Sequence, residues 1–169
     1  NTGEKIYDWE VPKEWIIRNA FLVGPDGEKY CDFQKTNLSI INYSIPVNNY
    51  FEFDELEKHI YTLPNLPTAI PYVTSYYQAN WGFCMPHEVF ERLPRVGKYH
   101  CYIDSNHIDG CLDYGHYFLN GGLSNKEILL SSYLCHPSLA NNELSGPLVL
   151  AGLYKRIKSW KTRRFNYRF

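Results

Sequence analysis

The sequence has no long apolar run and no sign of a targeting segment. Nowhere in its 169 residues do about 18 consecutive apolar residues occur, the length that a membrane span needs. Residues 1–30 lack a basic start followed by an apolar stretch, so no signal peptide is indicated. No internal repeat is present, and the 11 glycines and 10 prolines follow no period. These absences exclude membrane-spanning and collagen-like proteins, and we expect a soluble chain with no membrane partner.

The number and spacing of the cysteines fit neither a disulfide framework nor a zinc ribbon. The five cysteines are odd in number and include no C-x-x-C pair. Most of them flank or lie in strand-like runs, where a thiol packs as a small apolar residue. We therefore expect a reducing, cytoplasmic location and assign no cysteine a redox role.

Neither sign of charge is in excess. Seventeen basic and 18 acidic residues give a net charge of -1, which removes the usual electrostatic reason for a nucleic-acid partner. Residues 155–169 hold seven basic residues and no acidic ones, and these could form a phosphate-binding patch. They follow a helical pattern, however, and the helix dipole favours cations at a helix C-terminus. We expect no nucleic-acid partner.

The hydrophobic share of 44% and the aromatic share of 17% indicate a globular protein with a real core. Most of the chain reads as β-rich, with turn chemistry at Gly24–Gly27 that predicts a hairpin. Two short helices are expected, over Phe53–Tyr61 and Pro86–Leu93. The expected strands are Lys5–Val11, Ile16–Val23, Lys29–Phe33, Leu38–Val47, Pro71–Tyr77, Lys98–Asp104 and Cys111–Leu119. The last two are interpreted as an antiparallel pair.

The pattern changes after Gly121-Gly122. Glu127–Cys135 predicts a strand buried on both faces, and Glu143–Lys161 follows the period of an amphipathic helix after a loop at Ser138–Asn142. A further strand begins at Phe165, which completes a βαβ unit. Such a unit needs more strands and a second helical layer. Because the chain begins with Asn1 and ends inside an element, we interpret it as an internal fragment of a longer protein.

The candidate site lies where this strand gives way to the helix. His136 follows the strand, and Asn142 and Glu143 stand at the expected helix start, the place where ligands gather in open α/β sheets. Imidazole and carboxylate would supply two of the three or four ligands of a catalytic Zn²⁺. The spacing also fits a structural alternative, in which His136 is a hydrogen-bonded residue and Asn142 caps the helix.

Other side chains that could bind a ligand or take part in catalysis have simpler, structural interpretations. The remaining histidines show no recurring ligand spacing, and we assign no catalytic role to His59, His87, His100, His107 and His116. The carboxylates Asp104, Asp109 and Asp113 match no EF-hand loop and are interpreted as turn residues. The aromatic run of Tyr72, Tyr76, Tyr77, Trp81 and Phe83 could stack on sugar rings, but core packing is the favoured interpretation.

The segment at residues 136–147, H-P-S-L-A-N-N-E-L-S-G-P, resembles the first metal-site segment of aminopeptidase-like zinc hydrolases related to the M28 peptidases. It is especially similar to a bacterial subfamily associated with polysaccharide biosynthesis, whose members carry an inserted β-rich domain of unknown function. Residues 7–15 and 63–84 also resemble that subfamily. The resemblance implies an α/β fold, in which a partial parallel or mixed sheet core is interrupted by the insert. It assigns residues 1–29 to the core's opening strands, 30–120 to the insert and 121–169 to the resumed, truncated core.

The resemblance carries over to individual residues only in part. His136 matches the first zinc-binding histidine. In the commoner pattern H-P-S-x-A-N-D-N-L-S-G a metal-bridging Asp precedes an Asn, whereas here Asn142 holds the Asp position and Glu143 the next one. Neutral Asn carries no charge to offset two Zn²⁺ ions. Either Glu143 supplies the carboxylate, or this branch binds one metal, or it binds none.

The implied function is that of a zinc-dependent aminopeptidase-like hydrolase acting on an amide or peptide bond near a free amine. The substrate would be a small peptide or an amine-bearing compound, and one or two Zn²⁺ ions would be bound in the complete parent. The general base and remaining ligands are expected beyond Phe169, so the fragment alone should be inactive and hold zinc weakly. The alternative is a non-catalytic scaffold that binds carbohydrate or amine during polysaccharide biosynthesis. The insert could also be a homo-oligomerisation module.

Overall fold

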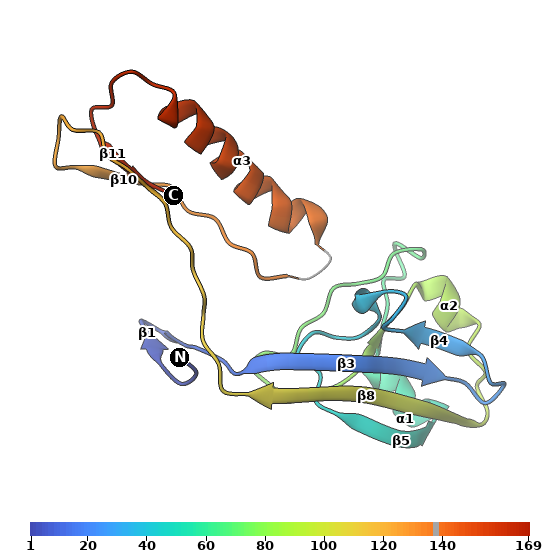
Figure 1. The fold of residues 1–169 in the computed structure, drawn as a ribbon. Helices are drawn as coiled ribbons and strands as arrows, with labels where there is room; N and C mark the ends of the chain where they lie inside the picture. Colours follow the sequence, from blue (N-terminus) through green and yellow to red (C-terminus); the bar gives the residue numbers. More distant parts are fainter. Residues whose placement is uncertain (137–138) are drawn as a thin grey trace. The chain divides into compact units, whose positions relative to one another are not determined.

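The computed structural model describes residues 1–136 and 139–169, which divide into two compact units, Asn1–Leu112 and Asp113–Phe169 (Figure 1). Pro137 and Ser138, which belong to the metal-site resemblance and to the expected loop, lie outside the described residues. The fold is mixed α/β, with several sheets, many strands and few helices. None of the described helices combines the length and apolar character needed to cross a membrane. The assignment of residues 1–29, 30–120 and 121–169 to core, insert and core stays a prediction.

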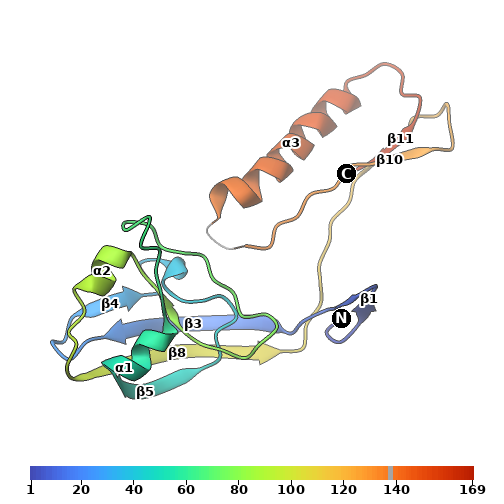
Figure 2. The ribbon, with the colours of Figure 1, turned by 180° about the vertical axis from the view of Figure 1, so that it is seen from behind.

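The first unit is built on a four-stranded antiparallel sheet with the order β4-β3-β8-β5. Its strands are β3 (Glu14–Val23), β4 (Lys29–Asp32), β5 (Val47–Glu52) and β8 (Lys98–Ile108). The turn at Gly24–Gly27 joins β3 to β4, which confirms the predicted hairpin. The two central strands pair along almost their whole length, from Glu14 opposite Ile108 to Val23 opposite His100 (Figure 2).

Short elements complete this unit. β1 (Lys5–Ile6) and β2 (Trp9–Glu10) form a small antiparallel hairpin, while β6 (Ile60–Tyr61) and β7 (Phe83–Cys84) pair in parallel. The helices are α1 (Phe53–Leu56), α2 (His87–Glu91) and the 3₁₀ turns η1 (Asn37–Ser39) and η2 (Glu57–His59).

The core of the first unit covers one face of the four-stranded sheet. Side chains alternate along the central strands, so that Tyr99, Cys101 and Ile103 of β8 point into the same cluster as Ala20 and Leu22 of β3. Helices and loops add the rest of this cluster: Phe53, Leu56, Trp81, Phe83, Met85 and Leu93. Burying each large apolar side chain contributes about 1.5–3 kcal/mol, so this cluster holds the sheet and its covering segments together.

Several sequence predictions for this unit were wrong. The strand expected at Leu38–Val47 is instead a 3₁₀ turn, capped by the Thr36 hydroxyl, followed by irregular chain that contains Tyr43 at a positive φ of 70°. The regular strand begins only at Val47. The helix expected at Phe53–Tyr61 ends early because Ile60 and Tyr61 pair with Phe83 and Cys84. Pro71–Tyr77 makes only an isolated bridge, between Thr74 and Asn42.

The antiparallel pair expected from Lys98–Asp104 and Cys111–Leu119 does not form. The first segment continues to Ile108 and takes both of its neighbours, β3 and β5, from earlier in the chain. The second is irregular except for β9 (Phe118–Leu119), which pairs in the other unit. Local alternation therefore identified strand residues but not their partners, which tertiary packing selects.

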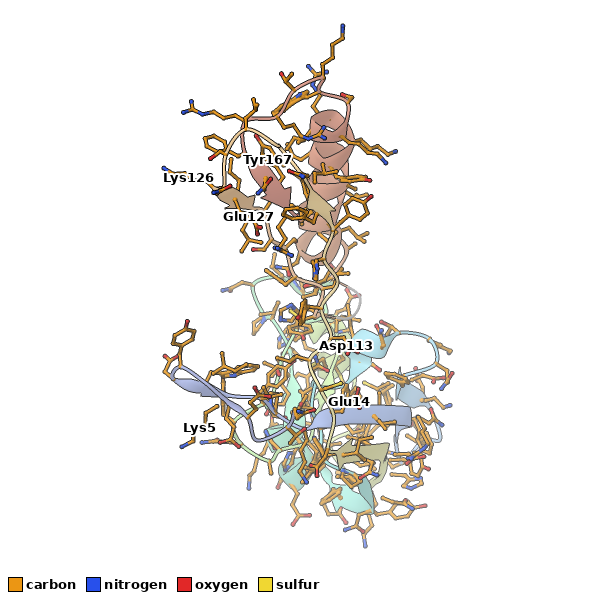
Figure 3. The ribbon with its side chains drawn as sticks, turned by 60° about the vertical axis from the view of Figure 1, so that its left-hand side comes forward. Lys5, Glu14, Asp113, Lys126, Glu127 and Tyr167 are labelled. Atoms are coloured by element: carbon orange, nitrogen blue, oxygen red, sulfur yellow. The ribbon has the colours of Figure 1, made fainter. Side chains whose placement is uncertain are left out.

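The second unit contains the predicted βαβ arrangement. β10 (Glu127–Leu129) and β11 (Asn166–Arg168) are parallel neighbours joined through α3 (Ala140–Lys158), and β9 pairs antiparallel with β11. Glu127 and Tyr167 mark the adjacent strands in Figure 3. Arg168 of β11 forms an ion pair with Glu127 across this junction at 2.6 Å.

Three details of the second unit differ from the prediction. The strand covers Glu127–Leu129 rather than Glu127–Cys135, and its residues are exposed rather than buried on both faces. The helix starts at Ala140, with Leu139 at its N-cap, so Asn142 lies inside the first turn. The buried core of this unit is small: it comprises Leu119, Ile157 and Tyr167, with four partly buried apolar side chains packed against them.

Candidate metal centre

The candidate site forms where the segment after β10 meets the first turn of α3. Leu130 still donates a backbone hydrogen bond to Arg168, after which residues 131–136 run without regular structure to His136. The backbone N–H of Glu143 donates to Leu139, which fixes this residue in the first turn of the helix. We expected His136 directly after a strand. It lies instead at the end of an irregular segment, which runs against the start of the helix.

Glycine allows the close approach of these two segments. A Cβ atom added to Gly146 would lie 2.2 Å from Oγ of Ser132, which is far inside van der Waals contact. Gly146 is one turn after Glu143, so the missing side chain lets α3 sit directly against the segment that carries His136. Gly152, further along the same helix, has nothing within 4 Å of such an added atom.

The carboxylate of Glu143 contacts both Cys135 and His136. Its Oε1 lies 2.8 Å from Nδ1 of His136, and its Oε2 accepts a hydrogen bond of 2.5 Å from the backbone N–H of Cys135. The Cys135 Sγ lies 3.3 Å from the same ring nitrogen. The Glu143 side chain is only 9% exposed and the His136 side chain 29%, so the carboxylate is almost enclosed while the imidazole still reaches the surface.

Hydrogen bonding keeps this carboxylate ionised. Burial by itself would raise the pKa of Glu143, but the backbone N–H of Cys135 and the imidazole of His136 outweigh it, and the pKa falls below its usual range. The pKa of the Cys135 thiol is raised, first by burial and then by the neighbouring negative charge of Glu143. The site thus combines a carboxylate anion, an imidazole and a thiol.

This donor set is suited to a transition metal. Among the residues that the structure describes, Cys135, His136 and Glu143 form a group whose ligand atoms all lie within 4.8 Å of one another. Thiolate sulfur, imidazole nitrogen and carboxylate oxygen are the three kinds of ligand that Zn²⁺ takes in proteins. Because an ionised carboxylate can only accept, the His136 proton belongs on Nδ1, and the ring's lone pair is then on Nε2. The residues present therefore fit a metal ion.

The structure brings together two of the three predicted ligands. His136 and Glu143 are in direct contact. Asn142 is exposed, and its side-chain oxygen accepts a hydrogen bond of 3.3 Å from the Tyr133 hydroxyl. Its role as a ligand stays a prediction. Sequence reasoning missed Cys135, because a cysteine at a strand end was interpreted as packing; its position directly before His136 was the available signal.

Three of the other histidines and two of the three candidate carboxylates have partners elsewhere in the fold. The His59 and His87 rings bond to the Trp81 carbonyl and the Thr62 hydroxyl, and His100 contacts Asn48. Asp104 is paired with Arg18, and Asp109 lies 3.7 Å from Lys13. These contacts agree with structural roles.

Two of the basic residues near the C-terminus also have structural partners. The guanidinium of Arg163 donates to the carbonyls of Ile157, Lys158 and Trp160 at the end of α3, and to that of Asn120. Arg168 pairs with Glu127. The Arg163 contacts support the interpretation that the basic run completes a helix end.

Comparisons with known proteins place the chain in a wider context. A protein of Clostridium acetobutylicum, provisionally named a polysaccharide biosynthesis protein with an aminopeptidase-like domain, is 42% identical over 168 residues, which are 99% of this chain and 38% of that protein. A crystal structure of a provisionally named peptidase from Clostridium acetobutylicum matches 99% of this chain and 39% of its own, with a TM-score of 0.90 and 42% identity. The chain thus spans about two fifths of the length of these relatives.

A known sequence family matches most of the first unit. The family described as a domain of unknown function, DUF2172, matches residues 14–106, more than half of the chain. The match runs from the start of β3 almost to the end of β8, so it contains nearly the whole four-stranded sheet. The chain therefore belongs to the DUF2172 family.

Proposed function

We propose that the chain is part of a zinc-dependent, aminopeptidase-like hydrolase related to the M28 peptidases, and that His136 and Glu143 belong to its metal site. The observation that carries this proposal is the nearly enclosed Glu143 carboxylate, 2.8 Å from a half-buried imidazole. The names of the relatives support the same class, since they are described as peptidase and as aminopeptidase-like. One or two metal ions in the longer protein would fit this reading.

Each residue of the site has a separate task in this proposal. His136 is a metal ligand, and Glu143 either ligates with it or holds its ring through the Nδ1–H bond, as carboxylates do beside metal-binding histidines. Cys135 adds a sulfur donor next to them. When bound, a zinc ion supplies Lewis acidity and lowers the pKa of a coordinated water molecule. The chain's own contribution is to hold an anion and an imidazole in a fixed orientation at the start of α3.

The proposed substrate is a small peptide or an amine-bearing compound, cleaved at an amide bond near the free amine. The general base and the remaining ligands would come from the longer protein, so these 169 residues alone should not hydrolyse peptides. In the same proposal residues 30–120 are an insert of the core, the protein is cytoplasmic, and the insert can mediate homo-oligomerisation. Nucleic acid and membranes are not proposed as partners.

One observation favours a second function, a scaffold that binds carbohydrate or amine without hydrolysis. Asn142 occupies the position at which the commoner pattern has a metal-bridging Asp, and its side chain bonds to Tyr133 instead of carrying a charge. Amide hydrolysis by a longer protein that contains this segment would separate the two functions. Zinc-dependent turnover of an aminoacyl anilide supports the hydrolase, whereas ligand binding without turnover supports the scaffold.

Zinc binding by the chain itself tests the site. We expect weak binding that is lost on dialysis, because Cys135, His136 and Glu143 supply only part of a ligand set. His136→Ala and Glu143→Gln should each weaken the titrated affinity by about tenfold or more. His116→Ala, at an exposed histidine of the same unit, is the matched control and should change nothing. Equal affinity in the wild type and His136→Ala would contradict the proposed site.

The absorption spectrum of bound Co²⁺ tests the same ligands independently. Co²⁺ bound to the wild type should show a sulfur-to-metal charge-transfer band, which Cys135→Ser removes and His116→Ala retains. A band that persists in Cys135→Ser would exclude Cys135 as a ligand while leaving His136 and Glu143 to be tested by zinc titration.

A further inference from the structure

A pocket of about 360 Å³ lies within the first unit, independent of the metal-site residues. Tyr43, Tyr76 and His107 supply aromatic walls, and Lys13, Ser75 and Pro12 complete much of the lining. This volume is at the lower end of the range for small-molecule sites, about 300–1,000 Å³. The pocket therefore suits a ligand of one or two small rings.

The wall residue Tyr43 has an unusual backbone. Its φ of 70° lies in the left-handed region, which a bulky side chain rarely adopts. Neighbouring bonds hold it there, since Asn42 and Ile45 donate backbone hydrogen bonds to Val73 and Asn80. Such conformations cost about 1–3 kcal/mol and cluster at ligand sites. Here the strained backbone directs the Tyr43 ring toward the pocket, where its hydroxyl is anchored on the Lys13 carbonyl.

Three rings gather around this residue. The Tyr43 ring centroid lies 4.3 Å from that of Tyr76 and 5.2 Å from that of His107, with Trp15 stacked behind it at 6.3 Å. Tyr76 comes from the aromatic run in which core packing was the expected role. Trp81 and Phe83 of that run are buried in the core, but Tyr76 is only partly buried and lines the pocket instead.

The polar groups of the lining carry little net charge. Lys13 brings a positive charge, and Asp109 balances it at 3.7 Å. Ser75 presents a hydroxyl, and His107 presents an imidazole that can donate or accept. A ligand that fits this lining has an apolar face to stack on the rings, hydroxyl groups at its edge and no net charge. A pyranose ring has all three properties.

We propose that the pocket formed by Tyr43, Tyr76 and His107 is a carbohydrate-binding site for a neutral pyranose unit. A second hollow, of about 510 Å³, is lined by residues 74–80 and shares Ser75, Tyr76 and Ala79 with the first. A neighbouring sugar of an oligosaccharide would enter this second hollow. The site lies within the sheet unit and does not depend on the proposed hydrolase function.

Sugar titrations of the full 169-residue chain test this inference. The probes are methyl β-glucopyranoside, methyl α-mannopyranoside, methyl β-galactopyranoside and N-acetylglucosamine, followed through the Trp15 indole N–H in heteronuclear NMR spectra. At least one probe should bind saturably with a Kd on the order of 1–10 mM. Binding should persist in EDTA and in His136→Ala, so failure of the metal-site proposal would not affect this result.

Substitutions of the aromatic pocket residues test whether their rings contact the sugar. Tyr76→Ala should weaken binding by about tenfold or more, and so should Tyr43→Gly, because glycine tolerates the positive φ and removes only the ring. Tyr50→Ala is the control, since Tyr50 is a 60% exposed tyrosine of β5 that does not line the pocket. Circular dichroism verifies the fold of each variant.

Three outcomes would overturn the proposal. These are no saturable shift with any probe up to about 50 mM, unchanged binding in both folded wall variants, or saturable binding of tetramethylammonium chloride without binding of any sugar. The last result would identify the aromatic walls as a cation site.

Discussion

At the scale of single residues, burial divides the five thiols into two classes. Cys31, Cys84 and Cys101 are buried in the first unit, whereas Cys111 and Cys135 are exposed. Burial also raises the pKa of Cys84 and Cys101 to about 12, so these thiols stay protonated near neutral pH. Because the thiolate is the reactive form, inaccessibility and the raised pKa both protect the buried thiols.

Thiol labelling should therefore occur in two steps. With a disulfide reagent at pH 8, we expect two thiols of the native chain to react promptly and three only after denaturation. Absorbance of the released chromophore gives the count. Cys135→Ala should reduce the prompt count by one and leave the slow count unchanged. Prompt reaction of more than two thiols in the native chain would show that the sheet core is not closed.

The same thiols make the first unit sensitive to alkali. Their pKa values are raised in the folded state, so their contribution to stability is complete below the unfolded value of about 8.5 and is lost as the pH rises above it. We expect the free energy of unfolding to fall by about 1 kcal/mol for each of these thiols between pH 8.5 and pH 9.5. Urea titrations between pH 8.5 and 9.5 measure this slope. Cys101→Ala should flatten it, and an unchanged slope in this variant would contradict the prediction.

Residue-scale reasoning identified part of the candidate site. His136 and Glu143 could be predicted because a strand, a loop and a helix of suitable length bring their positions together. Their direct hydrogen bond and the backbone donor of Cys135 could not, since both depend on where the irregular segment at residues 131–136 ends against α3.

At the scale of elements, the two glycines of α3 offer a matched test of how the site is held. Gly146 touches Ser132, and Gly152 faces open space. Gly152→Ala should stabilise the helix by up to about 1 kcal/mol through propensity alone. Gly146→Ala gains the same propensity but pushes the helix away from Ser132, and with it the Glu143 carboxylate from His136. We expect it to lose this gain and to weaken zinc binding.

Urea unfolding and zinc titration of both variants measure these effects. An equal gain in stability for the two substitutions, with unchanged zinc affinity in each, would mean that the helix position does not depend on Gly146.

Element types were easier to predict than element partners. The hairpin at Gly24–Gly27 and the parallel pairing of β10 with β11 follow from turn chemistry and from the strand-helix-strand order. The pairing of β8 with β3 and β5 joins residues far apart in the chain, and no local pattern encodes it. The local sequence also does not predict that the expected strand is interrupted at Tyr43, because tyrosine usually favours extended backbone.

At the scale of the whole molecule, the chain between the two units is the expected site of proteolysis. Residues 109–117 have no regular structure, and Leu112, Tyr114 and Tyr117 are 55%, 87% and 52% exposed. Limited chymotrypsin digestion should cut first after one of these residues and leave the sheet unit intact. Mass spectrometry identifies the cut. First cleavage at Phe83 or Tyr99, which are fully buried, would contradict the described core.

The long pairing of β3 with β8 imposes an order on synthesis. Glu14 leaves the ribosome well before its partner Ile108, and at about 5–20 residues per second the wait is roughly 5 to 20 s. During that interval one of the two central strands has a vacant edge and an uncovered apolar strip. The nascent chain is therefore most vulnerable to mispairing, and most dependent on chaperones, before β8 is translated.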